Sequence, residues 1–326
     1  MIPATHAGNL AQPRFHGEAL LLPVADGSDW PQAPVLEFAG TRLLRKSELH
    51  VTLLGRSHAS ALRERLDDAR IHRIATGFDW TVKRTGAGSV LAKLKHDGTA
   101  PLPCTSLVER IDMPAFTAFR DALATTAGLS IPDTCPHVTL YVAGDPEGIG
   151  LPDSATFAAL RQFDLPLPTA NERSPPPLPE ALRNAYLAAR YRIPPLGCSL
   201  HIGMPCPELD GELARHGARH ASILTAHNPC SVQLPPAANV LRQQLMHAEL
   251  EALGITTIIA ESHDPEGHWP SEPGLLAIDT PPDVDDTLLI RYRQHALVAL
   301  ELGQPARLVL HPAHRAPVVS PPLRDR

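Results

Sequence analysis

The chain has 326 residues, of which 43% are hydrophobic and 20% charged, and its formal net charge is −6. This length exceeds most single hydrophobic cores and predicts a globular protein of two domains. The negative net charge argues against a protein that coats long nucleic-acid duplexes, because such binding needs many Lys and Arg contacts to phosphates. The 35 prolines favour many stiff connections over long continuous helices.

The chain contains five cysteines, Cys104, Cys135, Cys198, Cys206 and Cys230. Their odd number and the lack of CxxC spacing indicate buried free thiols rather than a disulfide framework or a zinc ribbon. The N-terminal residues lack a basic stretch followed by an apolar core, and no stretch is long and apolar enough to span a bilayer. We therefore expect a cytoplasmic protein that does not enter the membrane.

In the first half, strands are expected at residues 18–24, 48–55, 79–84, 89–95, 105–111 and 137–144. Helices are expected at residues 57–76, 114–128 and 154–163. Gly77 and Gly128 suit the ends of the first two helices. A strand–helix–strand order thus occurs twice, which predicts a degenerate internal duplication.

A proline-rich stretch at residues 171–180 predicts an extended linker between domain 1–170 and domain 181–312, with a flexible tail at 313–326. In the second domain, helices are expected at residues 179–191, 238–253 and 283–292. Strands are expected there at residues 198–204, 221–226, 256–261, 275–279, 295–301 and 306–310. The whole chain is therefore predicted to be α+β, with a mixed α/β second domain.

One four-residue string occurs twice, as His50-Val51-Thr52-Leu53 and as His137-Val138-Thr139-Leu140. Side chains alternate between the two faces of a strand, so each His and Thr share one face while Val and Leu enter the core. Two such strands brought together would present two imidazoles and two hydroxyls. A single string of this kind is usually only a strand with one polar face, but its repetition favours a function.

This set of side chains suits phosphodiester hydrolysis without a metal or an organic cofactor. One histidine would take a proton from the attacking water and the other would protonate the leaving oxygen, because imidazole titrates near neutral pH. The hydroxyls of Thr52 and Thr139 would donate hydrogen bonds to the phosphate oxygens. The sequence leaves open whether His50 or His137 is the acid.

The repeated motif resembles the 2H phosphoesterases, the superfamily that includes RNA 2′,3′-cyclic phosphodiesterases and 2′-5′ RNA ligase-like proteins. The resemblance covers roughly residues 18–163 and includes the segments SLVERIDMPAF, PHVTLYVAG and GIGLPDS. It implies a bilobal fold in which the two motif strands line a central cleft. It also implies substrates with cyclic phosphates or 2′-5′ linkages.

Further residues are candidates for substrate binding in the first half. Tyr141 lies two positions after Thr139, so it shares the histidine face and could stack on a base or simply cap the cleft wall. Lys83 and Lys93 lie on predicted strands, and Arg45 precedes the first motif. Such cations could attract a phosphate, although most surface lysines only solvate a face.

The second half is similar to an uncharacterised bacterial family, the domain of unknown function 3293 family, in the segments ASILTAHNP, AANVLRQQL, HWPSEPGLL and RYRQHALVAL. Five polar or aromatic residues in apolar context are candidates there: Asn228, Asn239, Trp269, Glu272 and Gln294. Structural roles explain several of them, with Asn228 as a turn residue and Asn239 as a helix N-cap. The histidines and cysteines of this half match no compact metal-ligand spacing, and no metal site is expected.

We therefore expect a monomeric enzyme that hydrolyses a 2′,3′-cyclic phosphate or a 2′-5′ phosphodiester in a small nucleotide or at an RNA terminus. Three alternatives stay open at this point. The same cleft could bind an RNA end or a nucleotide without turnover, or the first domain could serve an activity located in the C-terminal domain. The third alternative is 2′-5′ ligation, because hydrolysis of a phosphodiester run backwards needs the same groups.

Overall fold

The computed structural model describes residues 12–96, 100–169, 175–267 and 269–315. The chain divides into two compact units, residues 1–169 with 235–241 and residues 170–234 with 242–326. Part of the predicted linker (171–174) and most of the predicted tail (316–326) lie outside the described residues. Within the described ranges, no helix combines the length and the apolar character that crossing a membrane would require.

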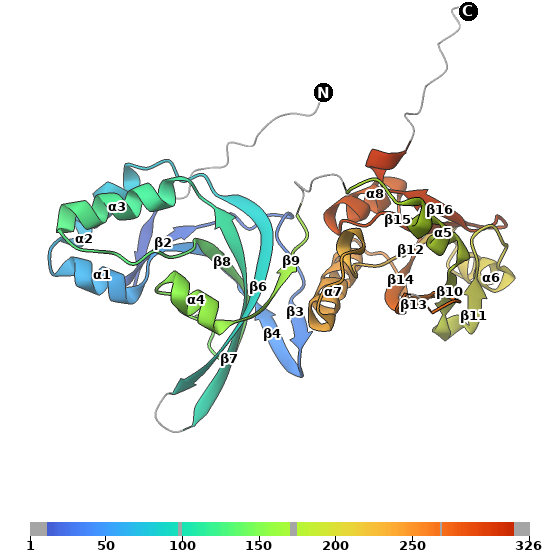
Figure 1. The fold of residues 1–326 in the computed structure, drawn as a ribbon, viewed down its shortest axis with the longest axis horizontal. Coiled ribbons are helices and arrows are strands. Elements are labelled where there is room, and N and C mark those ends of the chain that lie inside the picture. The colour runs from blue at the N-terminus through green and yellow to red at the C-terminus, as the bar shows by residue number, and fades with distance from the viewer. Residues whose placement is uncertain (1–11, 97–99, 170–174, 268, 316–326) are drawn as a thin grey trace, which may run out of the picture. The chain divides into compact units, whose positions relative to one another are not determined.

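The first unit is built on a nine-stranded antiparallel sheet (Figure 1). Its strands are β1 (Arg14–His16), β2 (Ala19–Pro23), β3 (Val35–Phe38), β4 (Thr41–Arg45), β5 (His50–Leu54), β6 (Lys83–His96), β7 (Pro101–Asp112), β8 (His137–Ala143) and β9 (Arg161–Pro166). The order is β1-β2-β5-β8-β7-β6-β9, and the β3–β4 hairpin joins through β4 to β8. The two motif strands β5 and β8 are therefore neighbours at the centre of the sheet.

Four helices accompany this sheet: α1 (Arg56–Arg63), α2 (Asp68–Thr76), α3 (Ala115–Ala127) and α4 (Ser154–Leu160). The prediction of one helix over residues 57–76 was wrong, because the helix is interrupted between α1 and α2. The Asp67 side chain accepts a hydrogen bond from the backbone N–H of Arg70 at 2.6 Å and so caps a new helix. The predicted end at Gly128 is confirmed, and this residue adopts a left-handed φ of 64°.

The strand predicted at residues 89–95 lies within one long strand, β6, and only the last two residues of the strand predicted at 79–84 belong to it, because β6 begins at Lys83. A bulge between Arg84 and Ala87 interrupts its pairing with β7 without ending it, and Gly86 lies in this bulge with a left-handed φ of 69°. Together β6 and β7 extend as a long arm (Figure 1). The helix predicted at 154–163 also ends earlier, since β9 begins at Arg161.

A charged pair is buried beside the bulge. The Glu109 side chain is fully buried and accepts hydrogen bonds from Arg84 Nη2 at 2.6 Å and from the backbone N–H of Gly86 at 2.9 Å. The Arg84 guanidinium also lies 4.6 Å from the centre of the Trp30 ring. These contacts fix the bulged end of β6 against β7 and hold the loop that contains Trp30.

The second unit contains a seven-stranded antiparallel sheet of order β11-β10-β13-β14-β12-β15-β16. Its strands are β10 (Arg190–Ile193), β11 (Cys198–Leu200), β12 (His220–Leu224), β13 (Thr257–His263), β14 (Glu272–Ile278), β15 (Ala296–Glu301) and β16 (Arg307–Leu310). Its helices are α5 (Glu180–Ala188), α6 (Pro207–Arg215) and α8 (Pro282–Arg291), and α7 (Pro236–Ala252) is divided between the two units at Leu241. Three single 3-10 turns lie at Pro194–Leu196, Pro229–Ser231 and Pro312–His314.

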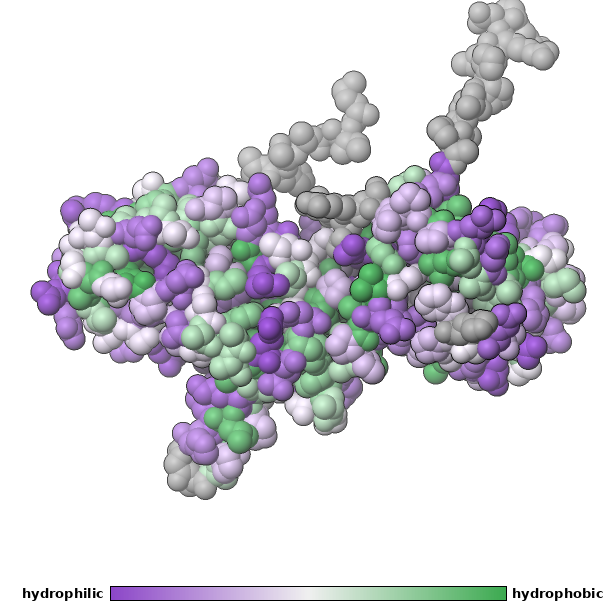
Figure 2. Space-filling view, in the orientation of Figure 1, coloured by the Kyte–Doolittle hydropathy of each residue, from purple (hydrophilic) through white to green (hydrophobic). Residues whose placement is uncertain are grey.

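Two helices of this unit differ from the prediction. The helix expected at 179–191 ends at Ala188, and the residues after it form β10. The helix α6 was not predicted, although Pro207 at its first position and acidic residues in its first turn are typical start signals. The chain is thus a mixture of helices and antiparallel sheets in both halves. Polar and apolar residues are interspersed over the visible face of each unit (Figure 2).

Candidate functional site

The two repeated motifs lie side by side on β5 and β8. These strands are antiparallel, and Val51 is directly opposite Val138. The register therefore sets His50 across from Thr139 and Thr52 across from His137, one step on either side of the valine pair. The two motifs are related by a local twofold axis through that pair.

Burial alternates along the four residues of each motif, as expected for strands with one core face. Val51 and Val138 are completely buried, and Leu53 and Leu140 are at most 2% exposed. The two histidines and two threonines of the motifs, on the other face, are all half-buried. Four polar side chains therefore gather on one partly accessible patch, which we call the HxT face.

A hydrogen bond to a nearby backbone carbonyl fixes the ring orientation of His137. Nδ1 lies 2.9 Å from the carbonyl oxygen of Cys135, and a carbonyl only accepts, so Nδ1 carries the proton. In the neutral ring, Nε2 is then the free acceptor. Burial lowers the pKa of His137 below its ordinary value of 6.5. The imidazole is therefore neutral at neutral pH and able to accept a proton.

The second imidazole is also held in its neutral form. Burial lowers the pKa of His50, and the nearby charge of Lys46 lowers it further. Glu48 and Glu147 act in the opposite direction. A phosphate anion bound on the HxT face would favour the protonated form of either ring, because an opposite charge nearby raises the pKa of an imidazole.

The structure adds an arginine that sequence reasoning missed. Arg110 on β7 lies directly opposite His137 on β8, so the two side chains share one face. Its Nε atom is buried and has no hydrogen-bond partner among the described residues. The sequence predicted a strand over residues 105–111. It did not predict that the strand pairs with β8, which places Arg110 beside His137.

Two other predicted residues lie further along β8 and β4. Tyr141 is completely buried, and no described residue hydrogen-bonds to its hydroxyl. Burial raises the pKa of this phenol. Arg45 lies opposite Tyr141, where its Nη2 contacts Asp26 at 2.6 Å and its Nε donates to the carbonyl of Pro31 at 2.7 Å. Arg45 therefore anchors the loop before β3.

The two predicted lysines are not brought to the HxT face. Both are exposed on β6, which β7 separates from β8. Lys83 lies opposite Asp112, and Lys93 lies opposite Cys104 on the long arm. His137 begins β8, and Cys104 lies beyond Thr105, which pairs with Ala143 at the other end of that strand. Lys93 is therefore the full length of β8 away from His137.

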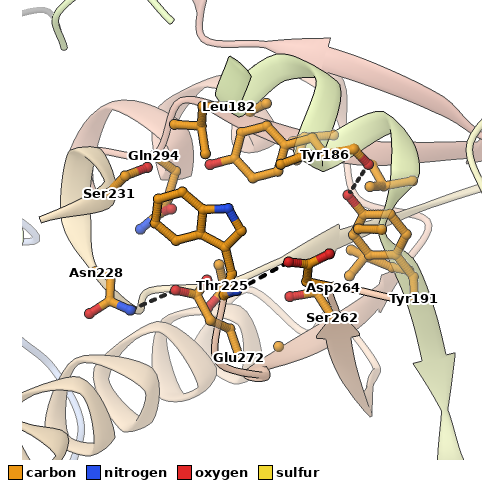
Figure 3. Close-up of a pocket in the computed structure, with 18 of the residues that line it drawn as sticks. Leu182, Tyr186, Tyr191, Thr225, Asn228, Ser231, Ser262, Asp264, Glu272 and Gln294 are labelled. Carbon is orange, nitrogen blue, oxygen red and sulfur yellow. Dashed lines mark hydrogen bonds between the residues drawn. The ribbon is translucent and has the colours of Figure 1, made fainter. Parts of the chain in front are cut away.

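In the second unit, four of the five predicted residues line one pocket of about 120 Å³: Asn228, Trp269, Glu272 and Gln294. Figure 3 shows Asn228 and Glu272 hydrogen-bonded on one side of this pocket, with Tyr186 on the other. Asn239 does not line it. It lies inside α7 and not at the N-cap position predicted for it, because the helix begins at Pro236.

The loop that carries Asn228 has an unusual backbone. Asn228, Cys230 and Ser231 all have a positive φ, between 44° and 59°. Non-glycine residues rarely adopt this conformation, which persists where surrounding contacts enforce it. The Asn228 side chain supplies one such contact by accepting the Leu234 N–H at 3.1 Å. Sequence reasoning found Asn228 as a turn residue but missed Tyr186 and Ser231, which also line the pocket.

No group of three or more His, Cys, Asp or Glu side chains within the described ranges is arranged to hold a metal ion. All five cysteines are free thiols.

Comparison with known proteins gives one match. The family described as "protein of unknown function (DUF3293)" matches residues 224–297, from the end of β12 into β15. This segment contains all five residues predicted for the second half. No curated protein and no solved structure matches the chain. The matched segment lies entirely in the second half of the chain.

Proposed function

We propose that the first unit is a metal-independent phosphodiesterase that hydrolyses a 2′,3′-cyclic phosphate or a 2′-5′ phosphodiester of a nucleotide or RNA end. The observation that carries this proposal is the Val51–Val138 pairing, which supports the assembly of His50, Thr52, His137 and Thr139 on one face. Two imidazoles and two hydroxyls related by local symmetry are the groups that an in-line displacement at phosphorus needs.

In the proposed reaction, a neutral imidazole removes a proton from water as the water oxygen bonds to phosphorus. The bond from phosphorus to the 2′ or 3′ oxygen breaks, and the other imidazole, protonated, gives its proton to that oxygen. The free Nε2 of His137 is available for either role, since its Nδ1–H is held by Cys135. Either histidine can act as the base, because the arrangement is symmetric.

The remaining groups of the HxT face would stabilise the charge on phosphorus. The hydroxyls of Thr52 and Thr139 would donate to the nonbridging oxygens, where negative charge grows in the transition state. Arg110 beside His137 would add a permanent positive charge and donors in a planar fork that suits phosphate. Its unpartnered Nε is consistent with a donor that is satisfied by substrate.

The test is hydrolysis of the four nucleoside 2′,3′-cyclic monophosphates in EDTA by the full chain and by His50→Ala and His137→Ala. We expect turnover by the wild type and a loss of about 10²–10⁴-fold in each variant. His16→Ala, which removes an exposed imidazole on β1, is the matched control and should keep full activity. Equal activity in all four proteins would exclude the mechanism. The position of the phosphate in the product identifies the bond that breaks.

A further inference from the structure

The pocket of the second unit has a distinctive chemical lining. Three aromatic side chains and two carboxylates line it, Tyr186, Tyr191, Trp269, Asp264 and Glu272. No Lys or Arg from the described ranges contributes to the lining. Its one described imidazole, on His263, lies 2.9 Å from a carboxylate oxygen of Glu261. The pocket therefore presents negative charge and aromatic faces to a ligand. Its described lining residues include no Lys or Arg side chain that could pair with an anion.

Gln294 adds an acceptor whose orientation is fixed. Its side-chain nitrogen donates to the carbonyl oxygens of His227 at 2.8 Å and Tyr292 at 3.3 Å. Because both partners are carbonyls, the amide nitrogen must lie on that side and Oε1 on the other. Gln294 is only 7% exposed, and no described residue donates to Oε1. A ligand with an N–H group would satisfy this atom.

Glu272 supplies a second oriented acceptor. Its Oε1 accepts a hydrogen bond from the Asn228 amide at 2.6 Å, and Asn228 is itself held by the Leu234 N–H. Among the described residues, Asn228 is the one that hydrogen-bonds to the Glu272 carboxylate, and it engages Oε1, so Oε2 is left for a ligand. Burial raises the pKa of Glu272, and the hydrogen bond from Asn228 acts in the opposite direction.

We propose that this pocket binds a small organic cation through an ammonium or guanidinium head group. The cation would pair with Glu272, donate an N–H to Gln294 Oε1 and contact the faces of Tyr186 and Trp269. Aromatic rings attract cations through their negative faces, and a carboxylate beside them adds charge and direction. The pocket volume limits the buried part of the ligand to a small head group. A neutral planar base is the competing ligand, and it would not need the carboxylate.

The test is calorimetric titration of the full chain with agmatine, which carries both head groups, and in parallel with adenosine as a neutral planar probe. Glu272→Gln keeps the shape of the side chain and removes its charge. We expect agmatine to bind the wild type and to bind this variant at least about tenfold more weakly. Glu251→Gln, which alters an exposed carboxylate of α7 outside the pocket, is the matched control and should bind as the wild type does.

Trp269→Leu provides a second variant that does not depend on a buried group, because Trp269 is 47% exposed. Its affinity for agmatine should fall several-fold with the fold intact. No agmatine binding to the wild type, unchanged affinity in Glu272→Gln, or tighter binding of adenosine would each overturn the proposal. His50→Ala should bind agmatine normally, so this proposal and that of the phosphodiesterase can fail separately.

Discussion

Val51 on β5 and Val138 on β8 face each other directly across an antiparallel pair, and both are completely buried. Each valine is flanked by a histidine and a threonine on the opposite face of its strand. A slip of one residue in this register would destroy the symmetry of the HxT face, because side chains alternate with a period of two. The buried valines therefore fix the geometry of the polar residues beside them.

The first prediction concerns the pH dependence of turnover. The proposed mechanism requires one imidazole protonated and one neutral in the free protein, and burial lowers the pKa of both His50 and His137 below 6.5. As pH rises above that range, the acid loses its proton, so kcat/KM should fall by up to about tenfold per unit. We expect a maximum of kcat/KM below about pH 6.5. A rate that is constant between pH 6 and 9 would contradict this assignment.

The second prediction separates the threonines from the histidines. Thr52→Val and Thr139→Val preserve shape and remove the hydroxyl donors, so each should lower kcat by about 10–10³-fold. The pH profile should keep its form, because both imidazoles remain. Thr41→Val, on the exposed side of β4, is the control and should leave kcat unchanged. The measurement is steady-state hydrolysis of a cyclic nucleotide.

The third prediction tests Arg110. Arg110→Met retains the aliphatic part of the side chain and removes the charge beside His137, so kcat/KM should fall by about 10²-fold. Arg110→Lys should recover only part of the loss, since an ammonium cannot form the planar contact. Arg73→Met, on the exposed face of α2, should behave as the wild type. Full activity in Arg110→Met would remove this residue from the site.

The fourth prediction concerns the buried pair of Arg84 and Glu109. Arg84→Met leaves the fully buried Glu109 carboxylate without its cation, which should cost about 3–5 kcal/mol of unfolding free energy. Changing both residues to Met should cost much less than the sum of the single changes, because no unpaired charge remains. Urea denaturation of the four proteins in the cycle measures this. Strict additivity would mean that the pair does not interact.

The fifth prediction links pH to stability in the second unit. His311 is buried, and its Nδ1 accepts the backbone N–H of Ala313 at 3.1 Å, so protonation there would break a hydrogen bond. Burial lowers its pKa to about 4. Between about pH 4 and the unfolded pKa near 6.5, the unfolded chain binds more protons at this histidine than the folded chain does. Stability should therefore fall as pH drops through this window, with a slope of at most about 1.4 kcal/mol per unit for this group.

His311→Asn can still accept the Ala313 N–H but does not titrate. The variant should show a shallower loss of unfolding free energy between pH 6.5 and 4 than the wild type does, measured by urea denaturation at each pH. His247→Asn, which alters a partly exposed imidazole on α7, is the control substitution.

The sequence by itself determined the local structure that depends on alternation and end signals. The repeated His-Val-Thr-Leu string predicted two strands with their polar residues on one face, and α3 ends at Gly128 as expected. In the second half, the helices at α7 and α8 and most strands were predicted within a few residues. Side-chain period and backbone preference are properties of short segments, so a single chain displays them.

Only the tertiary structure decided which strands became neighbours. The pairing of β5 with β8, the position of Arg110 beside His137 and the distance of Lys93 from both histidines all depend on contacts between residues far apart in the sequence. The same holds for the pocket, which is lined both by Tyr186 of α5 and by Glu272 of β14. Such contacts follow from the packing of whole sheets, and no local pattern encodes them.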